Sequence, residues 1–136
     1  MYENKIAIVL RDDLLNWQKF NVTSFLASSI AIAFPEVHGN AFVTKIEGEF
    51  LPFINQPILI YKADDEDTMR RIFNRSKERG LHIGVYPQSF FSTKSADENY
   101  LVMEKFNNEV DSLAGIVIFG ETKKVYKAID GLKLCD

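Results

Sequence analysis

The sequence is poor in several features that define common classes of protein. It has one cysteine, Cys135, among 136 residues, so it can form neither an internal disulfide nor a cysteine-based zinc site. Its 16 lysine and arginine residues nearly balance 19 aspartate and glutamate residues, which leaves a net charge of -3. Because nucleic-acid binding rests on an excess of basic residues, we expect no nucleic-acid partner. No apolar run approaches the roughly 18 residues that span a bilayer, so we expect no membrane association.

Sequence motifs of several enzyme classes are also missing. The chain has no glycine-rich nucleotide fingerprint, no P-loop and no nucleophile elbow, which disfavours nucleotide chemistry and serine hydrolysis of the usual kind. His38 and His82 are far apart and lack the spacing of a zinc site, so we expect no metal and no cofactor. The short apolar run 6–10 is followed directly by charged residues, unlike a signal peptide. We therefore expect a cytoplasmic protein.

The composition is that of a globular protein, with 46% hydrophobic and 26% charged residues, and the length suits one domain over residues 1–136. Apolar runs rich in β-branched residues alternate with helical patterns. The expected strands are 6–10, 58–61, 81–86 and 115–119, and the expected helices are 16–34, 64–79, 95–106 and 122–129. Because helical crossovers join parallel strands, this alternation predicts a three-layer α/β/α domain with a four-stranded, mostly parallel sheet.

Residues 40–53 stand outside this alternation. Two short apolar segments, 41–46 and 50–53, flank Gly48, which predicts a β-hairpin insertion. Phe42 and its aromatic neighbours give this insertion an apolar surface that a monomer rarely exposes. Two arrangements are open: the hairpin covers the first helix as a lid, or it pairs across the twofold axis of a homodimer. One face of the hairpin is apolar and the other mixed, which favours the lid.

Polar residues follow the expected strands where ligand sites of α/β proteins form. The candidate site residues are Arg11, Asp13, Lys19, Asn21, Ser24, Tyr86, Gln88 and Ser89. If the first and third strands are neighbours, these side chains can meet in one cleft at the carboxyl ends of the strands. The alternative for Arg11 and Asp13 is a surface ion pair. The alternative for Asn21 and Ser24 is hydrogen bonding back to their own helix.

Three functions remain open from the residues alone. The leading hypothesis is a small-molecule binding or regulatory module, with a cleft near Arg11, Lys19, Tyr86 and Gln88. The second is a hydrolase of a small ester or amide of an amino acid or peptide, with Lys19 and Asp13 as the catalytic pair. The third is a protein-interaction module that uses the aromatic hairpin.

The chain also resembles a known family, the domain of unknown function 2000 family. The segments that carry the resemblance are 5–14, 16–23, 34–36, 56–60, 79–81 and 131–134, which together span nearly the whole chain. That family is similar in fold to peptidyl-tRNA hydrolase II. The resemblance therefore implies a four-stranded mixed sheet with one antiparallel strand, helices on both faces, and a homodimer.

The resemblance does not extend to the catalytic elements of peptidyl-tRNA hydrolase II. Lys19 is the nearest match to the catalytic lysine of that enzyme, but Ser24 and Ala27 stand about where its helical glutamine and histidine occur. Residues 87–112 replace the signature that follows its third strand. We therefore expect no cleavage of a peptidyl-tRNA analogue at any salt concentration, and the resemblance implies the fold rather than the activity.

Overall fold

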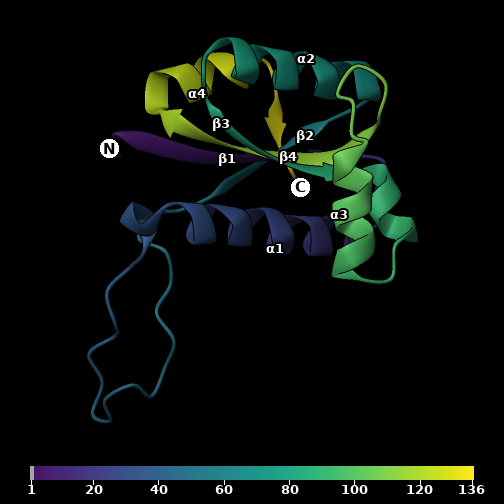
Figure 1. Ribbon diagram of the computed structural model, residues 1–136. Helices are drawn as coiled ribbons and strands as arrows, with labels where there is room; N and C mark the ends of the chain where they lie inside the picture. The colour runs from purple at the N-terminus through teal and green to yellow at the C-terminus, as the bar shows by residue number, and fades with distance from the viewer. Residues whose placement is uncertain (1) are drawn as a thin grey trace.

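Five strands form one sheet in the order β3-β4-β1-β2-β5 in the computed structural model, which describes residues 2–136 (Figure 1). The strands are β1 (Asn4–Arg11), β2 (Leu59–Ala63), β3 (His82–Pro87), β4 (Leu113–Glu121) and β5 (Lys133–Leu134). Only β1 and β2 are parallel neighbours, and β4 and β5 run antiparallel to every strand they pair with. The prediction of a mixed sheet is therefore confirmed, whereas the predictions of four strands and of a mostly parallel arrangement are wrong.

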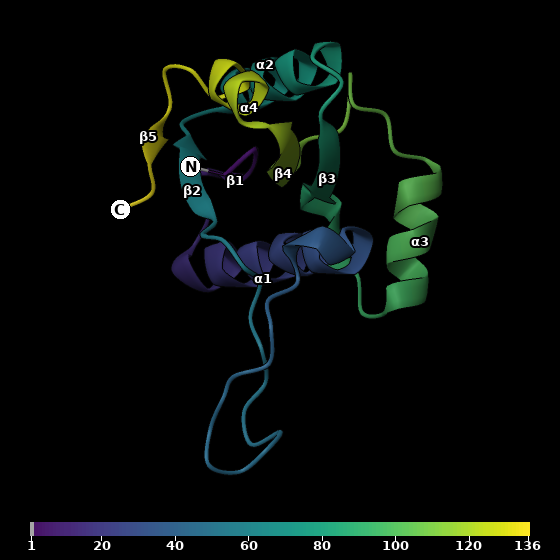
Figure 2. The ribbon, with the colours of Figure 1, turned by 90° about the vertical axis from the view of Figure 1, so that its left-hand side faces the viewer.

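The direction of β4 follows from the position of the helix that precedes it. Helix α3 (Ala96–Glu104) stands beside the sheet next to β3 and covers neither face (Figure 2). The chain therefore re-enters the sheet at the end where β3 left it, and β4 runs back along β3. Strand β5 has only two residues, too few for a hydrophobic pattern to predict.

Three helices complete the outer layers, and their positions confirm the predicted helical segments. Helix α1 (Asn16–Ala33) covers one face of the sheet, and α2 (Glu66–Glu78) and α4 (Thr122–Ala128) cover the other (Figure 1). Short 3-10 helices follow α1 at Pro35–Val37 and β3 at Gln88–Ser92. The α/β/α layering is thus as expected, although the sheet between the layers is different.

The two faces of β1 belong to two hydrophobic cores. Ile8 and its alternate neighbours pack with the buried residues of α1, including Val22. Val9 and its alternate neighbours pack with α2 and α4, including Ile72. Because both faces of the strand are covered, the run 6–10 is apolar without alternation.

Helix α1 packs directly on β4 at a position where that strand has a glycine. A Cβ atom added at Gly115 would lie 2.8 Å from Cγ1 of Val22 and 3.2 Å from Cδ1 of Leu26. We expect Gly115→Ala to lower the free energy of unfolding by about 1–3 kcal/mol, since the helix must move outward or the side chains leave their rotamers. Urea denaturation of the two proteins measures this difference. An unchanged stability would contradict the close packing of α1 on the sheet.

Residues 40–53 form an irregular projecting loop, here called the arm. Backbone hydrogen bonds tie its base, from Gly39 N–H to the Phe53 carbonyl at 2.9 Å and from Asn55 N–H to the Val37 carbonyl at 2.7 Å, and one turn bond lies at its tip, from Glu49 N–H to the Ile46 carbonyl at 3.2 Å. The arm points away from α1 and the sheet (Figures 1 and 2). The predicted hairpin strands and the predicted lid over α1 are therefore wrong. A two-stranded hairpin without further strands or a core beneath it is marginal in water.

Candidate functional site

The side of α1 that faces β3 forms one wall of an open pocket, here called the aromatic pocket, with a volume of about 420 Å³. Its wall residues on α1 recur once per turn, at Trp17, Asn21 and Phe25, so they share one face of the helix. The lining residues are Trp17, Asn21, Phe25, Tyr86, Phe90, Phe91, Thr93, Lys94, Ser95, Ala96 and Asn99. The pocket thus lies between α1, the end of β3 and the start of α3.

Contacts between aromatic rings hold this pocket in shape. The ring centroid of Tyr86 lies 5.1 Å from that of Phe90, 5.4 Å from that of Phe91 and 5.9 Å from that of Phe25. The Trp17 and Phe91 rings are 6.2 Å apart in an edge-to-face arrangement. These distances lie in the range of favourable aromatic pairs, so the rings support one another and leave an apolar surface toward the opening.

A few polar groups interrupt the aromatic lining. Burial raises the pKa of the Tyr86 hydroxyl above its ordinary value, and the neighbouring Asn21 side chain acts in the opposite direction. The Tyr86 hydroxyl is therefore protonated at neutral pH and can donate a hydrogen bond. Thr93 Oγ1 donates to the Phe90 carbonyl at 2.8 Å, which fixes the turn before α3. Lys94 is the charged residue among the lining residues, so the lining carries a positive charge.

Lys19 lies in a different pocket, on the side of α1 that faces β2. This Lys19 pocket has a volume of about 470 Å³ and is lined by Leu10, Asn16, Lys19, Phe20, Thr23, Ile58, Leu59, Ile60, Leu134, Cys135 and Asp136. Lys19 Nζ forms an ion pair with Oδ1 of Asp12 at 3.1 Å. Burial raises the pKa of the Cys135 thiol, which therefore stays protonated at neutral pH.

The structure separates Arg11 from the other candidate residues. Successive side chains of β1 alternate between faces, so Arg11 lies on the side of α2, with Val9, and not on the side of α1. Arg11 Nη2 lies 2.8 Å from Oδ2 of Asp13, which confirms the surface ion pair. Its Nε is buried without a hydrogen-bond partner within the described residues. Lys19 pairs with Asp12, and not with Asp13 as the hydrolase hypothesis assumed.

The remaining candidates lie outside both pockets. Ser24 is exposed and donates to the Phe20 carbonyl of its own helix at 2.8 Å, so its hydrogen bonding is local. The backbone N–H of Gln88 donates to the Ser112 carbonyl at 3.0 Å, and Ser89 is exposed. The strands β1 and β3 are not neighbours, because β4 lies between them. The prediction of a single cleft is therefore wrong. Of the candidate site residues, only Asn21 and Tyr86 line the same pocket.

Sequence reasoning missed most of the aromatic pocket. The spacing of Trp17, Asn21 and Phe25 was a usable signal, since residues four apart share a helix face. Phe90 and Phe91, directly after a strand that ends in Tyr86, were a second signal. Aromatic residues on helices usually belong to the hydrophobic core. Neither signal therefore shows whether these side chains line a pocket or are packed in the core.

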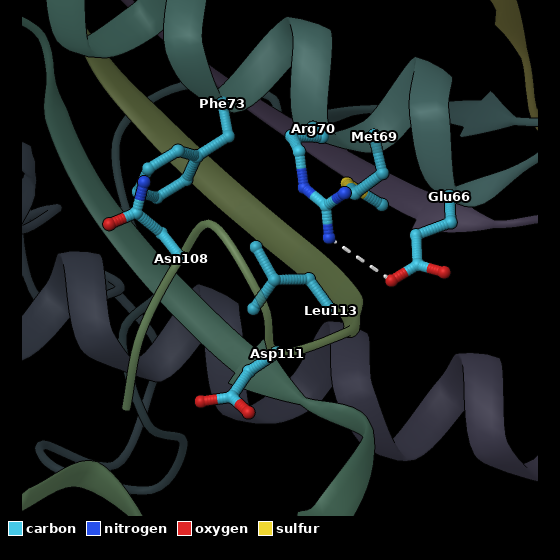
Figure 3. Close-up of a pocket in the computed structure, with 7 residues that line it drawn as sticks. All are labelled: Glu66, Met69, Arg70, Phe73, Asn108, Asp111 and Leu113. Atoms are coloured by element: carbon cyan, nitrogen blue, oxygen red, sulfur yellow. Dashed lines mark hydrogen bonds and ion pairs between the residues drawn. The ribbon is translucent and has the colours of Figure 1, made fainter. Parts of the chain in front are cut away.

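A third cavity, between α2 and the segment before β4, is too small for a ligand. Figure 3 shows its lining, with Arg70 and Glu66 of α2 on one side and Asp111 on the other. Arg70 Nη2 lies 3.2 Å from Oε1 of Glu66, so its charge is compensated. The cavity volume of about 10 Å³ is at most enough for one water molecule.

Residues 2–136 contain neither a cluster of metal ligands nor a membrane-spanning helix. Within that range, no three histidine, cysteine, aspartate or glutamate side chains lie close enough together to hold a metal ion. None of the helices in the same range combines the length and the apolar character needed to cross a membrane. The aromatic pocket and the Lys19 pocket are therefore the candidate ligand-binding sites on the α1 side of the sheet.

Comparisons with known proteins place the chain among proteins of unknown function. Residues 4–136 match the model of the family described as "Protein of unknown function (DUF2000)". The solved structure of the protein of unknown function Atu0240 from Agrobacterium tumefaciens strain C58 is 33% identical in sequence, with a TM-score of 0.92 and full coverage of both chains. None of the curated proteins matches the chain. The family match extends over all but the first three residues, and the chain belongs to the DUF2000 family.

Proposed function

We propose that the protein binds a small aromatic carboxylic acid in the aromatic pocket. The observation that carries this proposal is the group of five aromatic side chains, on three separate elements, that line one open hollow. An aromatic ring of the ligand would stack or make edge contacts with Tyr86, Phe90 and Phe91. Pockets for small ligands combine such apolar walls with a few placed polar groups.

The polar groups favour an acid over a neutral or basic ligand. The protonated Tyr86 hydroxyl and the Asn21 amide are hydrogen-bond donors, and Lys94 adds a positive charge. Hydrogen bonds to a carboxylate are stronger than those between neutral groups. No acidic side chain lines this pocket among the described residues, and the nearby Glu98 carboxylate accepts a hydrogen bond from the backbone N–H of Lys94.

Trp17 makes the proposal easy to test, because it is the only tryptophan of the chain and lines the pocket. We expect titration with phenylacetate to change the tryptophan fluorescence in a saturable way. Cyclohexylacetate, which lacks the aromatic ring, and phenylacetamide, which lacks the charge, should each bind at least several times more weakly. Equal affinity for all three compounds, or a signal that never saturates, would contradict the proposal.

A hydrolase of a small amino-acid or peptide ester or amide is the second candidate. It is supported by the position of Lys19 in its own pocket, beside Asn16 and Thr23. The ion pair with Asp12 at 3.1 Å opposes it, because it holds the Lys19 Nζ against a carboxylate instead of leaving it free to attack a substrate. Asp13, the other proposed catalytic residue, is engaged by Arg11.

Amine labelling distinguishes the two candidates. We expect a limiting amount of an amine-reactive reagent at neutral pH to modify Lys19 no faster than exposed lysines such as Lys77, because Asp12 contacts its Nζ at 3.1 Å and its side chain is only 21% exposed. Peptide mapping by mass spectrometry gives the extent of labelling at each lysine. Selective modification of Lys19 would favour the hydrolase.

We also propose that the protein is a homodimer. No charged residue occurs between Lys19 and Glu36, and the outer face of α1 exposes the row Phe20, Ser24, Ser28 and Ile32. The two serine hydroxyls donate to carbonyls of their own helix, at 2.8 and 2.7 Å, and need no outside partner. Small residues between larger apolar ones allow a second helix to approach closely.

The arm supplies the matching half of this interface. Its side chains Val43, Leu51 and Phe53 are exposed, and the arm projects from the end of α1 away from its own domain (Figure 2). One chain thus carries two adjoining apolar surfaces, the α1 face and the arm, that none of residues 2–136 covers. A second copy related by a twofold axis supplies the complement to both surfaces at once.

Two further properties fit the fold and composition. We propose a relationship to the peptidyl-tRNA hydrolase II fold, which is supported by the mixed sheet with β4 antiparallel between β1 and β3. We propose a cytoplasmic location, which is supported by the single free cysteine, Cys135.

A further inference from the structure

A basic surface lies on the side of the sheet opposite to α1. Arg71, Arg75 and Arg79 recur once per turn along α2 and therefore share one face of that helix, over a length of about 12 Å at 1.5 Å per residue. This face meets α4 and the segment that joins α4 to β5, at the top of the molecule in Figure 2. The surface is therefore separate from the aromatic pocket, and it adjoins the Lys19 pocket where Lys62 pairs with Asp136.

Two hollows divide this surface, and three basic side chains line each one. The first has a volume of about 300 Å³ and is lined by Lys62, Asp64, Thr68, Arg71, Gly131, Leu132 and Lys133. The second has a volume of about 420 Å³ and is lined by Arg75, Arg79, Tyr126, Lys127 and Asp130. Six basic side chains thus face two acidic ones, although the whole chain has a net charge of -3.

Most of these six cations are not neutralised. Lys62 forms an ion pair with Asp136 at 3.3 Å, and no other member of the six has a carboxylate within ion-pair distance in the described part of the chain. Arg75 and Arg79 each donate one guanidinium hydrogen bond to a backbone carbonyl, of Asp130 at 3.5 Å and of Arg75 at 3.2 Å. The guanidinium groups keep further donors for an outside partner.

Helix stability explains only part of this arrangement. Basic residues near the end of α2 stabilise its negative pole, which accounts for Arg75 and Arg79. It does not account for Lys62 and Lys133, because these lie on β2 and β5 and line the first hollow. Lys127 lies in the last turn of α4, where it stabilises the negative pole of that helix, and it also lines the second hollow. Like charges that converge repel one another, so the arrangement costs stability unless an anion binds there.

We infer that this surface binds a short oligophosphate chain. Guanidinium groups bind phosphate oxygens in a bidentate way, and lysines add point charges. Two cationic hollows along one helix suit a linear ligand that places one phosphate group in each hollow. A single small anion could fill only one of them. A long nucleic acid is disfavoured, because the surface has one aromatic residue for base stacking, Tyr126, and the acidic rest of the protein repels it.

The experiment is calorimetric titration of the full-length protein with tripolyphosphate, at low salt and without divalent cations. We expect saturable binding that weakens as potassium chloride is raised, since the attraction is screened. Arg71→Gln in the first hollow and Lys127→Gln in the second should each weaken binding about tenfold, the effect of one lost hydrogen bond to a charged group. Both side chains are exposed, so the variants should fold.

Lys77→Gln is the matched control, because Lys77 is exposed on the same helix, lines neither hollow and carries the same charge. We expect it to change the tripolyphosphate affinity less than twofold. Equal losses in all three variants, or no binding by the wild-type protein, would overturn the inference. Tighter binding of a single-stranded oligonucleotide than of tripolyphosphate would also overturn it. Phenylacetate titration of the same variants should be unchanged, which keeps this test separate from that of the aromatic pocket.

Discussion

Replacing Ile32 by aspartate is expected to convert the proposed homodimer into a folded monomer. The Ile32 side chain is 81% exposed within the chain, so a charge there costs the isolated fold little. In the dimer it would lie between two apolar helix faces, where an unpaired carboxylate costs several kcal/mol. We expect the dissociation constant to rise at least about a hundredfold, which corresponds to roughly 2.7 kcal/mol.

Sedimentation equilibrium measures this change, and circular dichroism shows whether the variant is folded. Val110→Asp is the matched control, because Val110 is also largely exposed, at 72%, but lies in the segment before β4 and outside the proposed interface. The control should remain dimeric. A wild-type protein that is monomeric at high micromolar concentration, or an Ile32→Asp variant that dimerises as tightly as the wild type, would contradict the interface.

The arm can be tested separately with Leu51→Asp. Leu51 is 83% exposed and lies within the arm, far along the chain from Ile32. If the arm lies on the partner subunit, this substitution should weaken the dimer as Ile32→Asp does and leave the monomer folded. A dimer unaffected by Leu51→Asp would show that α1 alone forms the interface.

The second large effect is expected at Tyr86. Tyr86→Phe keeps the ring that packs on Phe25, Phe90 and Phe91 and removes only the hydroxyl. The loss of a hydrogen bond to a carboxylate costs about 1.5–3 kcal/mol, so phenylacetate should bind at least about tenfold more weakly. Binding of phenylacetamide should change less, because its hydrogen bonds are weaker.

Trp17 fluorescence gives the affinities, and Tyr126→Phe is the control. Tyr126 lies on the other side of the sheet, on α4, and loses the same hydroxyl. Equal loss of affinity in both variants, or none in Tyr86→Phe, would show that the Tyr86 hydroxyl does not contact the ligand. Thermal unfolding of each variant checks that the fold is retained.

The order of helices and strands could be read from the sequence because burial fixes local patterns. The run Ile6–Leu10 is apolar throughout because both faces of β1 are covered, and the Met69, Ile72 and Phe73 spacing reflects one buried face of α2. Acidic residues at the start of α2 and basic residues at its end identified this helix equally well. Such signals depend on residues close together in the chain.

The direction of a strand and the composition of the site depend on contacts between residues that are far apart in the chain. Local sequence patterns do not predict these contacts. Whether β4 runs parallel or antiparallel depends on where α3 lies, and none of the α3 residues is buried to reveal its position. The candidate cleft assumed that β1 and β3 are neighbours, but β4 separates them. Tyr86 and Asn21 therefore meet in a pocket with Phe90 and Phe91, while Arg11 lies on the opposite face.

Contacts between bound phenylacetate and the protein test the central proposal most directly. We expect intermolecular nuclear Overhauser effects from the ring protons of phenylacetate to the side chains of Tyr86, Phe90 and Phe91. These three aromatic residues line the proposed site, and the Lys19 pocket contains none of them. Effects to Phe20 and Ile58 instead would place the ligand in the Lys19 pocket and contradict the account, as would the absence of any effect at saturating phenylacetate.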